Sequence, residues 1–521
     1  MARILVTEKL SPRGLNLMTE AGHEVDVQLS LTPEALNEAV VGAAALVIRS
    51  ATQVTADVIE AGRDLVAVGR AGIGLDNVDI EAATRRGVIV ANAPESNIVS
   101  AAEHAFALML AQARNIPQAH AGLIEGRWER SKWEGVELNG KTLGIVGLGR
   151  VGSLVAQRGI AFGMRVIAYD PYITADRARK MGAELLSLED LFCDADFVSI
   201  HLPKSPETVG LIGKDLLAKS KPGIRIVNAA RGSIVDEEAL AEAITSGRVA
   251  GAALDVFSTE PCTSSPLFGL KNVVVTPHLG ASTTEAQDKA GEQIAEQIVL
   301  ALAGEFVPYA VNVAATGASE TVRQFLGVSE RLGHVMASLC GGVPDHLEVS
   351  CEGALGGEDT RVLSLGVLKG IFAWACEEPV SYVNVPRIAQ ESGLEVRESS
   401  TTVASEHVSQ LTLRGGGHSV SGTLGWNSTE RIVMVDDHSV DLPFAPNLLI
   451  VRNDDRPGMV GIVGAALGNA GVSITNMAVG QTSGGGTALM LLSTDRPVTH
   501  DVLGDLQDQP GILDLCCVTG A

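Results

Sequence analysis

The chain has 521 residues, of which 39 are basic and 62 acidic, so its net charge is −23 and its isoelectric point lies near 4.9. An acidic surface of this kind repels phosphate backbones, which argues against nucleic acid as a partner. The length predicts about three or four domains, and a content of 46% apolar but only 3% aromatic residues predicts globular domains with aliphatic cores.

The seven cysteines are odd in number and irregularly spaced, which indicates reduced thiols rather than disulfides or a metal cluster. The first residues, MARILVTEK, lack the apolar core of a signal peptide. No apolar run approaches the roughly 20 residues of a membrane helix. We therefore expect a soluble, cytoplasmic protein without a resident metal.

The first hundred residues alternate short aliphatic runs with helical patterns. This alternation, with continuously apolar strands, is typical of a parallel, doubly wound α/β sheet. We expect strands at 3–7, 25–28, 45–49, 65–71 and 88–92 and helices at 11–22, 32–42, 55–62 and 79–87.

A long apolar helix at 98–112 leads into a second βα series. Its six expected strands with helices between them make a complete dinucleotide-binding domain of the Rossmann type. A long helix follows at 283–303, and we expect it to return to the first sheet. The first domain would then be discontinuous (1–97 and 281–310), with the Rossmann domain at 98–280. The six strands are expected at 142–146, 165–170, 197–202, 225–229, 250–256 and 273–277.

The remaining third of the chain is mixed. Residues 304–319 have the composition of a linker, and 311–446 form an α+β region with helices at 320–339 and 361–376 and strands within 408–442. In the last region, 447–521, the elements follow the order β-α-β-β-α-β, which is the ferredoxin-like arrangement.

The sequence GLGRVG at 147–152 fits the pattern G-x-G-x-x-G, follows an expected strand and opens an expected helix. Gly147 permits the tight turn, Gly149 lets the backbone approach a pyrophosphate, and Gly152 lets the helix pack closely on the strand. The N-terminus of the helix offers N–H groups and partial positive charge to the anion.

Asp170 ends the next strand, 18 residues beyond Gly152. A carboxylate there accepts hydrogen bonds from ribose hydroxyls and repels a 2′-phosphate, which favours NAD over NADP as cofactor. The alternative is a purely structural glycine turn beside a solvated Asp170.

Three charged residues follow expected strands of the Rossmann domain: Arg231, Glu260 and His278. The carboxyl ends of parallel strands meet at the ligand crevice, so the three can converge. A neutral His278 would take a hydroxyl proton as hydride leaves, Glu260 would orient the imidazole and stabilise its protonated form, and Arg231 would bind a carboxylate. Taken singly, each also has an ordinary structural interpretation as a surface or loop residue.

The segments NAARG at 228–232, LDVF at 254–257 with Glu260-Pro261, and TPHLG at 276–280 resemble the D-isomer-specific 2-hydroxyacid dehydrogenases over residues 1 to about 310. Within that family, VIRS at 47–50, GRAG at 69–72, DNVD at 76–79 and the two C-terminal domains are similar to the long-form D-3-phosphoglycerate dehydrogenases. The resemblance implies the roles above for Arg231, Glu260 and His278. It also implies NAD contacts at Arg150, Val151, Asp170, Ala229 and Asp255.

The same resemblance implies substrate contacts at Arg49, Ser50, Arg70 and Asn97, of which the two arginines follow strands of the first sheet. Without it, ordinary loop salt bridges would explain these arginines as well. A further basic segment at 127–132 would join the subunit interface, where Arg130 or Lys132 could reach a neighbour's active site.

Residues 447–521 resemble an ACT domain, through DRPG at 455–458 and the Gly-Val pair at 471–472. The resemblance places effector contacts at Asn453, Asp455 and Ser473. Two of these depart from the usual choice in serine-regulated relatives, so inhibition by L-serine and simple dimerisation both stay open. Residues 311–446 resemble the intervening domain of the long-form enzymes, with expected roles in assembly and regulation.

The sequence thus predicts NAD-dependent oxidation of D-3-phosphoglycerate to 3-phosphohydroxypyruvate, for serine synthesis, by a homodimer or homotetramer. One alternative is a dehydrogenase for another 2-hydroxy or 2-oxo acid, such as glyoxylate or 2-oxoglutarate. Another is a non-catalytic, NAD-sensing scaffold.

Overall fold

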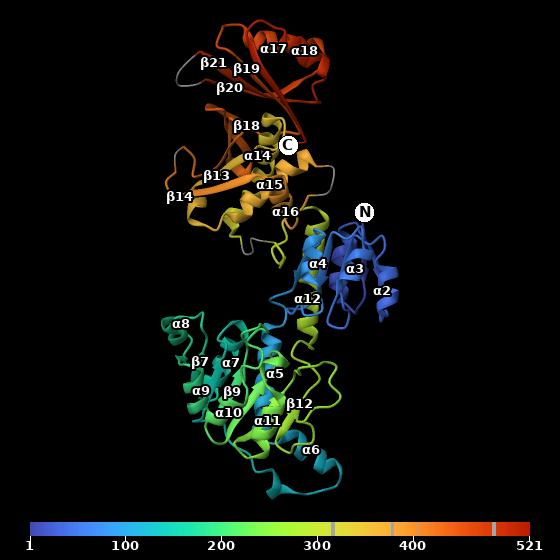
Figure 1. The fold of residues 1–521 in the computed structure, drawn as a ribbon, viewed down its shortest axis with the longest axis vertical. Coiled ribbons are helices and arrows are strands. Elements are labelled where there is room, and N and C mark those ends of the chain that lie inside the picture. The colour runs from blue at the N-terminus through green and yellow to red at the C-terminus, as the bar shows by residue number, and fades with distance from the viewer. Residues whose placement is uncertain (314–317, 377–379, 405, 482–485, 521) are drawn as a thin grey trace.

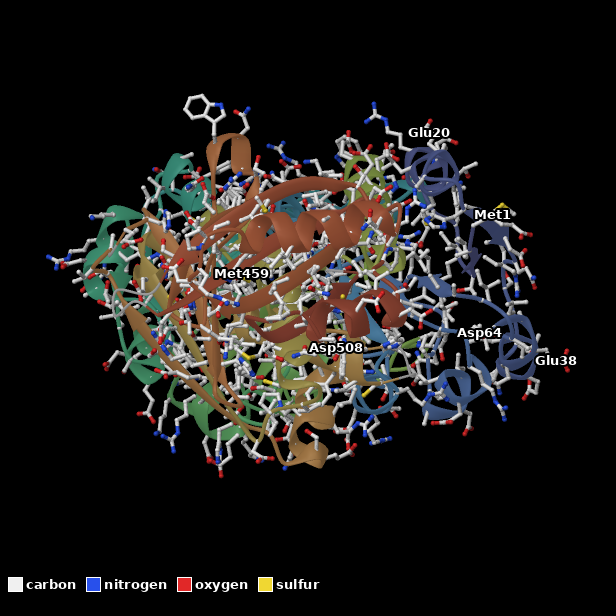
Figure 2. All side chains as sticks on the ribbon, turned by 90° about the horizontal axis from the view of Figure 1, so that it is seen from above. Met1, Glu20, Glu38, Asp64, Met459 and Asp508 are labelled. Carbon is white, nitrogen blue, oxygen red and sulfur yellow. The ribbon has the colours of Figure 1, made fainter. Side chains whose placement is uncertain are left out.

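The structure is a computed structural model that describes residues 1–313, 318–376, 380–404, 406–481 and 486–520. Four sheets follow one another along an elongated molecule, with the C-terminal sheet at one end and the sheet of the glycine-rich motif at the other (Figure 1). Seen along the long axis, Met1, Glu38 and Asp64 lie to one side of Met459 and Asp508, so the N-terminal sheet is offset from that axis (Figure 2). Within the described residues, every helix is too short or too polar to cross a bilayer.

The first sheet has the strand order β2-β1-β3-β4-β5, and all of its pairs are parallel. Its central strands are aliphatic on both faces, because helices cover both. The strands are β1 (Arg3–Val6), β2 (Glu24–Val27), β3 (Ala45–Ile48), β4 (Ala67–Arg70) and β5 (Ile89–Asn92), and the helices are α1 (Pro12–Glu20), α2 (Pro33–Ala39), α3 (Ala56–Ala61) and α4 (Ile80–Arg85).

The second sheet has the order β12-β11-β10-β9-β6-β7-β8, again all parallel. It contains the six expected strands and a seventh, β8, whose two residues are too few to leave an apolar pattern. The chain reverses direction across the sheet between β6 and β9, which is where this topology opens a ligand crevice. The strands are β6 (Thr142–Val146), β7 (Arg165–Tyr169), β8 (Glu184–Leu185), β9 (Phe197–Ile200), β10 (Ile224–Asn228), β11 (Val249–Leu254) and β12 (Val273–Val275), and the helices are α6 (Ile116–Ile124), α7 (Arg150–Ala161), α8 (Ala175–Lys180), α9 (Leu188–Asp194), α10 (Lys214–Lys219) and α11 (Glu237–Thr245).

Two long helices, α5 (Ile98–Ala113) and α12 (Thr284–Leu302), connect these sheets. Helix α12 follows the second sheet in sequence but packs on α1 and β4 of the first. The approach is close, since a Cβ placed on Gly14 would lie 2.6 Å from the carbonyl oxygen of Gly291. The first sheet is therefore packed against residues that come before the Rossmann segment in sequence and against residues that come after it.

The segment after α12 is more ordered than its linker-like composition predicts. The N–H of Val311 donates to the carbonyl of Val90 at 2.8 Å, and Asn312 Oδ1 accepts from the Val90 N–H at 2.9 Å. These bonds fasten residues 310–312 to the edge strand β5. The expected linker is thus hydrogen-bonded to the first sheet at these residues, a contact that leaves no periodic signal in the sequence.

The third sheet has the order β14-β13-β15-β16-β17-β18, with β13 and β14 parallel and the other pairs antiparallel. The sequence interpretation missed β13, β14 and α16. Strand β14 is almost entirely exposed and polar, so no alternation marks it. The elements are α13 (Glu320–Gln324), α14 (Leu326–Cys340), β13 (His346–Gly353), α15 (Arg361–Ala375), α16 (Val385–Ser392), β14 (Glu395–Thr401), β15 (Ser409–Gly415), β16 (His418–Leu424), β17 (Glu430–Val435) and β18 (His438–Pro443).

The fourth sheet, β20-β21-β19-β22, is antiparallel and has the expected β-α-β-β-α-β order. Its helices cover one face, through Leu449 and Val451, while Leu448 and Ile450 on the opposite face join the core of the third unit. The two C-terminal units therefore pack as one body. The elements are β19 (Asn447–Asp454), α17 (Met459–Asn469), β20 (Ile474–Gln481), β21 (Thr487–Thr494), α18 (His500–Gln507) and β22 (Ile512–Thr519).

Candidate active site

The predicted catalytic residues follow three neighbouring strands of the second sheet. Arg231 comes after β10, Glu260 after β11 and His278 after β12, and these strands lie side by side. The loops touch as well, because a Cβ on Gly232 would lie 1.9 Å from the carbonyl carbon of Phe257. Only glycine permits this approach of the Arg231 loop to the Glu260 loop.

His278 and Glu260 form a direct pair, with 2.6 Å between Nδ1 and Oε2. The other carboxylate oxygen of Glu260 accepts the N–H of Phe257 at 2.9 Å. Burial alone would raise the pKa of Glu260, but the hydrogen bonds from His278 and from the Phe257 N–H outweigh it, so the pKa lies below its usual value. Glu260 is therefore a carboxylate at neutral pH, bound to one ring nitrogen and leaving the other, Nε2, for proton transfer.

Arg231 reaches from the second sheet to the loop after β4. Its Nε lies 3.3 Å from Asp76 Oδ2, and a Cβ on Gly74 would lie 2.3 Å from its Nη2. Asn228 shapes the turn that carries it, since Asn228 Nδ2 donates to the Arg231 carbonyl at 2.9 Å. The guanidinium thus lies where residues of the two sheets meet.

Arg49, which follows β3, and Arg70, the last residue of β4, bring further positive charge to this place. Burial lowers the pKa of Arg70 to about 10, with the charges of Arg231 and Arg49 adding to the effect. At neutral pH the side chain is still a cation. Its buried Nε has no hydrogen-bond acceptor among the described residues. Three arginines within electrostatic reach of one another, one of them unsatisfied, make a site that fits an anion.

The loop after β3 is held by two side chains. Glu8 Oε1 accepts the N–H groups of Arg49 and Thr52, each at 2.9 Å, and Asn77 Nδ2 donates to the carbonyls of the same two residues at 2.8 and 2.6 Å. Ser50, between them, is exposed. The loop therefore presents Arg49 and Ser50 from a fixed backbone.

Asn97 stands directly before α5, at the passage from the first sheet to the second. Its Oδ1 is buried and meets no donor within the part of the chain that the structure describes. An unsatisfied buried amide oxygen is costly, which suits a side chain whose partner is a ligand.

The glycine-rich turn has the geometry of a pyrophosphate cradle. Gly147 adopts a φ of +97°, and a Cβ on Gly152 would lie 2.0 Å from the Gly147 carbonyl oxygen, so both positions require glycine. Nothing lies within 4 Å of a Cβ placed on Gly149. This open space in front of the N-terminus of α7 fits the diphosphate of a dinucleotide.

Asp170 directly follows β7 and lies next to the glycine-rich turn. Its two oxygens accept the N–H groups of Leu148 and Tyr172, each at 2.9 Å. Arg150, in the first turn of α7, is paired with Glu95 at 3.1 Å, while Val151 and Ala229 are half-buried beside the cradle. The carboxylate of Asp170 thus orders the glycine loop itself, in addition to any contact with a ribose.

Asp255 differs from the other predicted cofactor residues because its side chain is 0% exposed. Its oxygens accept from Thr276 Oγ1 at 2.6 Å and from the N–H groups of Leu279 and Gly280 at 2.7 and 2.8 Å, and they lie 3.0 Å from His104 Nε2. Burial would raise the pKa of this carboxyl, but these bonds outweigh it and lower the pKa. The structure ties Asp255 to the loop that carries His278.

Sequence reasoning missed two histidines near the site. His201, after β9, is half-buried, and desolvation of its ring lowers its pKa to about 4, so it is neutral at physiological pH. Its carbonyl oxygen would lie 2.6 Å from a Cβ on Gly147. The sequence could have indicated His201, because it follows a strand that borders the point where the strand order of the sheet reverses. His104 lies within a helix, where no strand-end rule applies.

Of the predicted effector residues, Asn453 lies near the end of β19, Asp455 directly follows that strand, and Ser473 directly precedes β20. Asn453 is 2% exposed, and its Oδ1 has no donor among the residues with described positions. Asp455 is exposed, as is Ser473, whose N–H donates to Asp495 Oδ1 at 2.9 Å. Asn453 and Asp455 lie at one end of the fourth sheet, level with the end of β20, whereas Ser473 precedes β20 and lies at the opposite end, next to the start of β19. The structure therefore does not bring the three predicted effector residues together within one chain.

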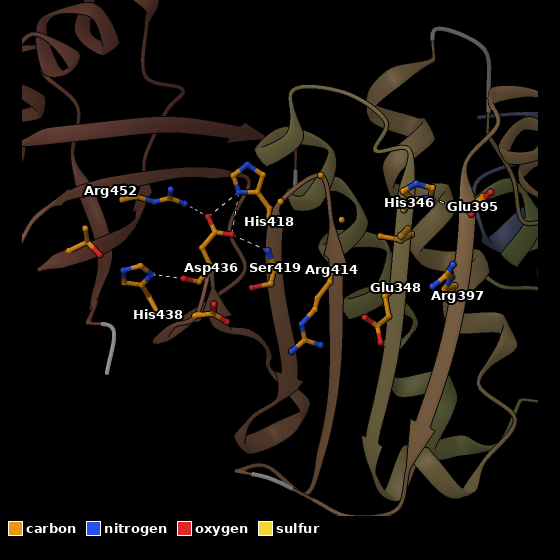
Figure 3. A pocket seen from close by; sticks show the side chains of 16 residues that line it. His346, Glu348, Glu395, Arg397, Arg414, His418, Ser419, Asp436, His438 and Arg452 are labelled. Carbon is orange, nitrogen blue, oxygen red and sulfur yellow. Dashed lines mark hydrogen bonds and ion pairs between the residues drawn. The ribbon is translucent and has the colours of Figure 1, made fainter. Parts of the chain in front are cut away.

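A separate groove of about 800 Å³ lies between the third and fourth sheets, far from the catalytic loops (Figure 3). At one end of it Asp436 accepts from Ser419 N–H at 2.9 Å, lies 3.0 Å from His418 Nδ1 and pairs with Arg452. Because Arg452 belongs to β19, this cluster fastens the fourth sheet to the third.

Family models match most of the chain beyond the first sheet. Residues 106–280 match the D-isomer specific 2-hydroxyacid dehydrogenase NAD-binding domain, 321–436 the D-3-phosphoglycerate dehydrogenase intervening domain, and 447–511 the ACT domain.

Among curated relatives, the D-3-phosphoglycerate dehydrogenase of Mycobacterium tuberculosis is 49% identical over 507 residues, 96% of each chain. That of Archaeoglobus fulgidus is 41% identical over 521 residues, 98% of this chain and 99% of the relative.

Solved structures resemble the first two sheets. A protein from Thermus thermophilus gives a TM-score of 0.56 at 36% identity, over 59% of this chain and 99% of that one. The NAD⁺-bound 3-phosphoglycerate dehydrogenase of Entamoeba histolytica gives 0.51 at 29% identity, over 60% of this chain and 98% of that one.

Proposed function

The chain belongs to the D-3-phosphoglycerate dehydrogenases, a branch of the D-isomer-specific 2-hydroxyacid dehydrogenases, and from this premise we propose how its residues act. The reaction is NAD-dependent oxidation of D-3-phosphoglycerate to 3-phosphohydroxypyruvate, the first step from 3-phosphoglycerate toward L-serine. The observation that carries the assignment of roles is the 2.6 Å pair of His278 and Glu260 beside a group of arginines.

His278 acts as the general base. Bound NAD supplies the hydride acceptor; the protein's part is to remove the hydroxyl proton as the C2–H bond breaks. Nδ1 of His278 is held by Glu260, so Nε2 receives that proton. The carboxylate of Glu260 then stabilises the imidazolium, which returns the proton when the reaction runs in the reducing direction.

Arg231 binds the carboxylate of the substrate, and Arg49 and Arg70 bind its phosphate. Arg231 emerges from the sheet that carries His278, while the other two emerge from the first sheet. A planar guanidinium suits bidentate contact with a carboxylate and polarises the adjacent carbonyl as it forms. Ser50 and Asn97 complete this part of the site, the latter through its buried Oδ1.

Gly147, Gly149 and Gly152 would hold the diphosphate of NAD, with Arg150 and Val151 at the helix N-terminus. Asp170 would accept hydrogen bonds from the adenosine ribose, and its charge disfavours NADP. Ala229 and the loop that Asp255 anchors would line the nicotinamide end.

Steady-state NADH formation with D-3-phosphoglycerate and a panel of other D-2-hydroxy acids tests the proposed reaction. The expected result is a kcat/KM for D-3-phosphoglycerate at least about tenfold above any other acid, because only this substrate engages all three arginines. Absence of turnover with 3-phosphoglycerate and with 3-phosphohydroxypyruvate would refute the assignment, and preference for glyoxylate or 2-oxoglutarate in reduction would favour a different 2-oxo acid.

For the ACT domain, we propose L-serine as effector, bound near Asn453 and Asp455, while the third predicted contact, Ser473, lies at the other end of the sheet within one chain. What supports this is the unsatisfied Oδ1 of Asn453 near the exposed Asp455. Titration of activity with L-serine, with L-alanine as control, decides between inhibition and a role in association alone.

We further propose a discontinuous substrate domain (1–97 and 281–310), the Rossmann domain at 98–280, the intervening domain at 311–446 and the ACT domain at 447–521. The packing of α12 on the first sheet supports the discontinuous boundary. A homo-oligomer is expected, since helix α6 exposes Ile116, Leu123 and Ile124, and Trp128 follows them in the segment that contains Arg130 and Lys132. Sedimentation analysis distinguishes monomer, dimer and tetramer.

A further inference from the structure

Helix α5 contacts the loop 276–280, which carries the catalytic histidine, at two points. Ser100 Oγ donates to the carbonyl of Gly280 at 2.8 Å. One turn later, His104 Nε2 lies 3.1 Å from Thr276 Oγ1 and 3.0 Å from Asp255 Oδ1. Residues four apart share one face of a helix, so a single face of α5 binds both ends of the segment 276–280.

The buried carboxylate of Asp255 is the centre of this contact. One side-chain oxygen accepts from Thr276 Oγ1 and from the N–H of Leu279, and the other from the N–H of Gly280. The backbone carbonyl of Asp255 accepts the N–H of His278 itself at 2.8 Å. One residue thus binds the chain before, at and after the catalytic histidine.

The backbone of His278 needs such support. Its φ is 55°, in the left-handed region that a residue with a Cβ rarely adopts. A conformation of that kind persists only where the surroundings hold it. Because Asp255 is fully buried, the loss of any hydrogen-bond donor to its carboxylate would be costly. Among the contacts of the described residues, His104 is the one donor side chain that comes from outside the 276–280 loop.

We propose that His104 is a positioning residue for His278. Its Nε2–H donates to Asp255 Oδ1 and Thr276 Oγ1 and thereby keeps Asp255 oriented to hold the His278 loop in its catalytic conformation. The tautomer follows from the partner, since a carboxylate can only accept. The role rests on the proposed function of His278 as base, and His104 acts on it through Asp255 and Thr276.

Two variants separate a hydrogen-bonding role from a packing role. His104→Leu fills the space without a donor, whereas His104→Gln places an amide N–H near the position of Nε2. We expect kcat to fall about tenfold in H104L with KM for both substrates changed less than about twofold, and to recover to within about threefold of the parent in H104Q. His500→Leu, at an exposed histidine of the ACT domain, is the matched control and should leave kcat unchanged.

Hydrogen exchange of the peptide containing residues 276–282 gives a readout independent of turnover. The amides of Leu279 and Gly280 should exchange faster in H104L and at the parental rate in H104Q. Parental kcat and exchange in H104L would overturn the proposal, as would equal losses in H104L and H104Q. If H104L fails to fold, His104→Asn, whose shorter amide cannot reach Asp255, replaces it with the same expectations. An unaltered chain that does not oxidise 3-phosphoglycerate would refute the proposed function, while the exchange data would still decide the role of His104.

Discussion

The two sheets that face the active site are both parallel and covered by helices, but they prepare their polar groups in opposite ways. The first sheet presents Arg49 after β3 and Arg70 at the end of β4, and the second presents Glu260 and His278 after β11 and β12. Glu260 and His278 are bonded to each other and, through Phe257 and Asp255, to the backbone around them. Arg70 has a buried Nε without an acceptor among the described residues and a pKa lowered to about 10.

This difference separates two tasks. A group that moves a proton must keep one geometry, and several hydrogen bonds fix it. A group that binds an anion gains most when no partner inside the protein competes for it, at the expense of some stability in the empty site. Substitutions of the proton-transfer pair on the second sheet should therefore lower kcat, whereas substitutions of the arginines on the first sheet should raise KM.

The largest effect is expected at His278. His278→Ala removes the proton acceptor, so kcat should fall about 10³-fold while KM for D-3-phosphoglycerate changes little, as initial rates will show. A variant with near-parental turnover would mean that another group is the base.

Glu260→Gln should lower kcat about 10²-fold, because an amide cannot stabilise the imidazolium that forms. Since the pKa of Glu260 lies below its ordinary value, its carboxylate stays charged as pH falls from neutral. Titration of the Glu260 carboxyl in the parent, followed by NMR, should therefore have its midpoint below the ordinary glutamate pKa of about 4.3. A midpoint at or above that value would contradict the depressed pKa.

Arg70→Ala should raise KM for D-3-phosphoglycerate about 10- to 100-fold with a smaller change in kcat, because a charge-assisted hydrogen bond to the anion is lost. Arg70→Lys is the matched control that retains the charge, and its KM should lie between the KM of the parent and that of Arg70→Ala. A loss confined to kcat would place Arg70 with the chemistry instead.

Arg49→Ala should have the smallest effect of the four, a rise in KM of about tenfold. Within the described residues, the guanidinium of Arg49 makes a long and exposed hydrogen bond, 3.4 Å from Nη1 to the Lys9 carbonyl, whereas Nε of Arg70 is buried. Added salt should reduce the difference in KM between the variant and the parent, because salt screens exposed charges. An effect larger than that of Arg70→Ala would reverse the ranking of the two arginines.

Much of this molecule could be predicted from the sequence where local patterns are strong. Continuous aliphatic strands and capped helices mark both parallel sheets, and the GLGRVG turn needs its glycines for reasons visible in the printed sequence. The catalytic trio was predicted because each member follows a strand. Strand β14, polar and exposed, and the two-residue β8 left no such pattern.

The residues that hold the catalytic loop in place were harder to predict than the catalytic residues themselves. The bond from His104 to Asp255 joins residues 151 apart in sequence, and a histidine inside an apolar helix gives no sign of which strand it will meet. Asp255 was predicted as a cofactor contact, whereas its complete burial became visible only in the fold. Roles of individual site residues and the domain boundaries stay predictions.

The most direct test of the division between the two sheets compares D-3-phosphoglycerate with D-glycerate, which lacks only the phosphate. The ratio of kcat/KM for the two substrates should be large in the parent and in His278→Ala, and should fall at least about tenfold in Arg70→Ala, because only that variant loses a phosphate contact. An unchanged ratio in Arg70→Ala would contradict the assignment of the first sheet to anion binding.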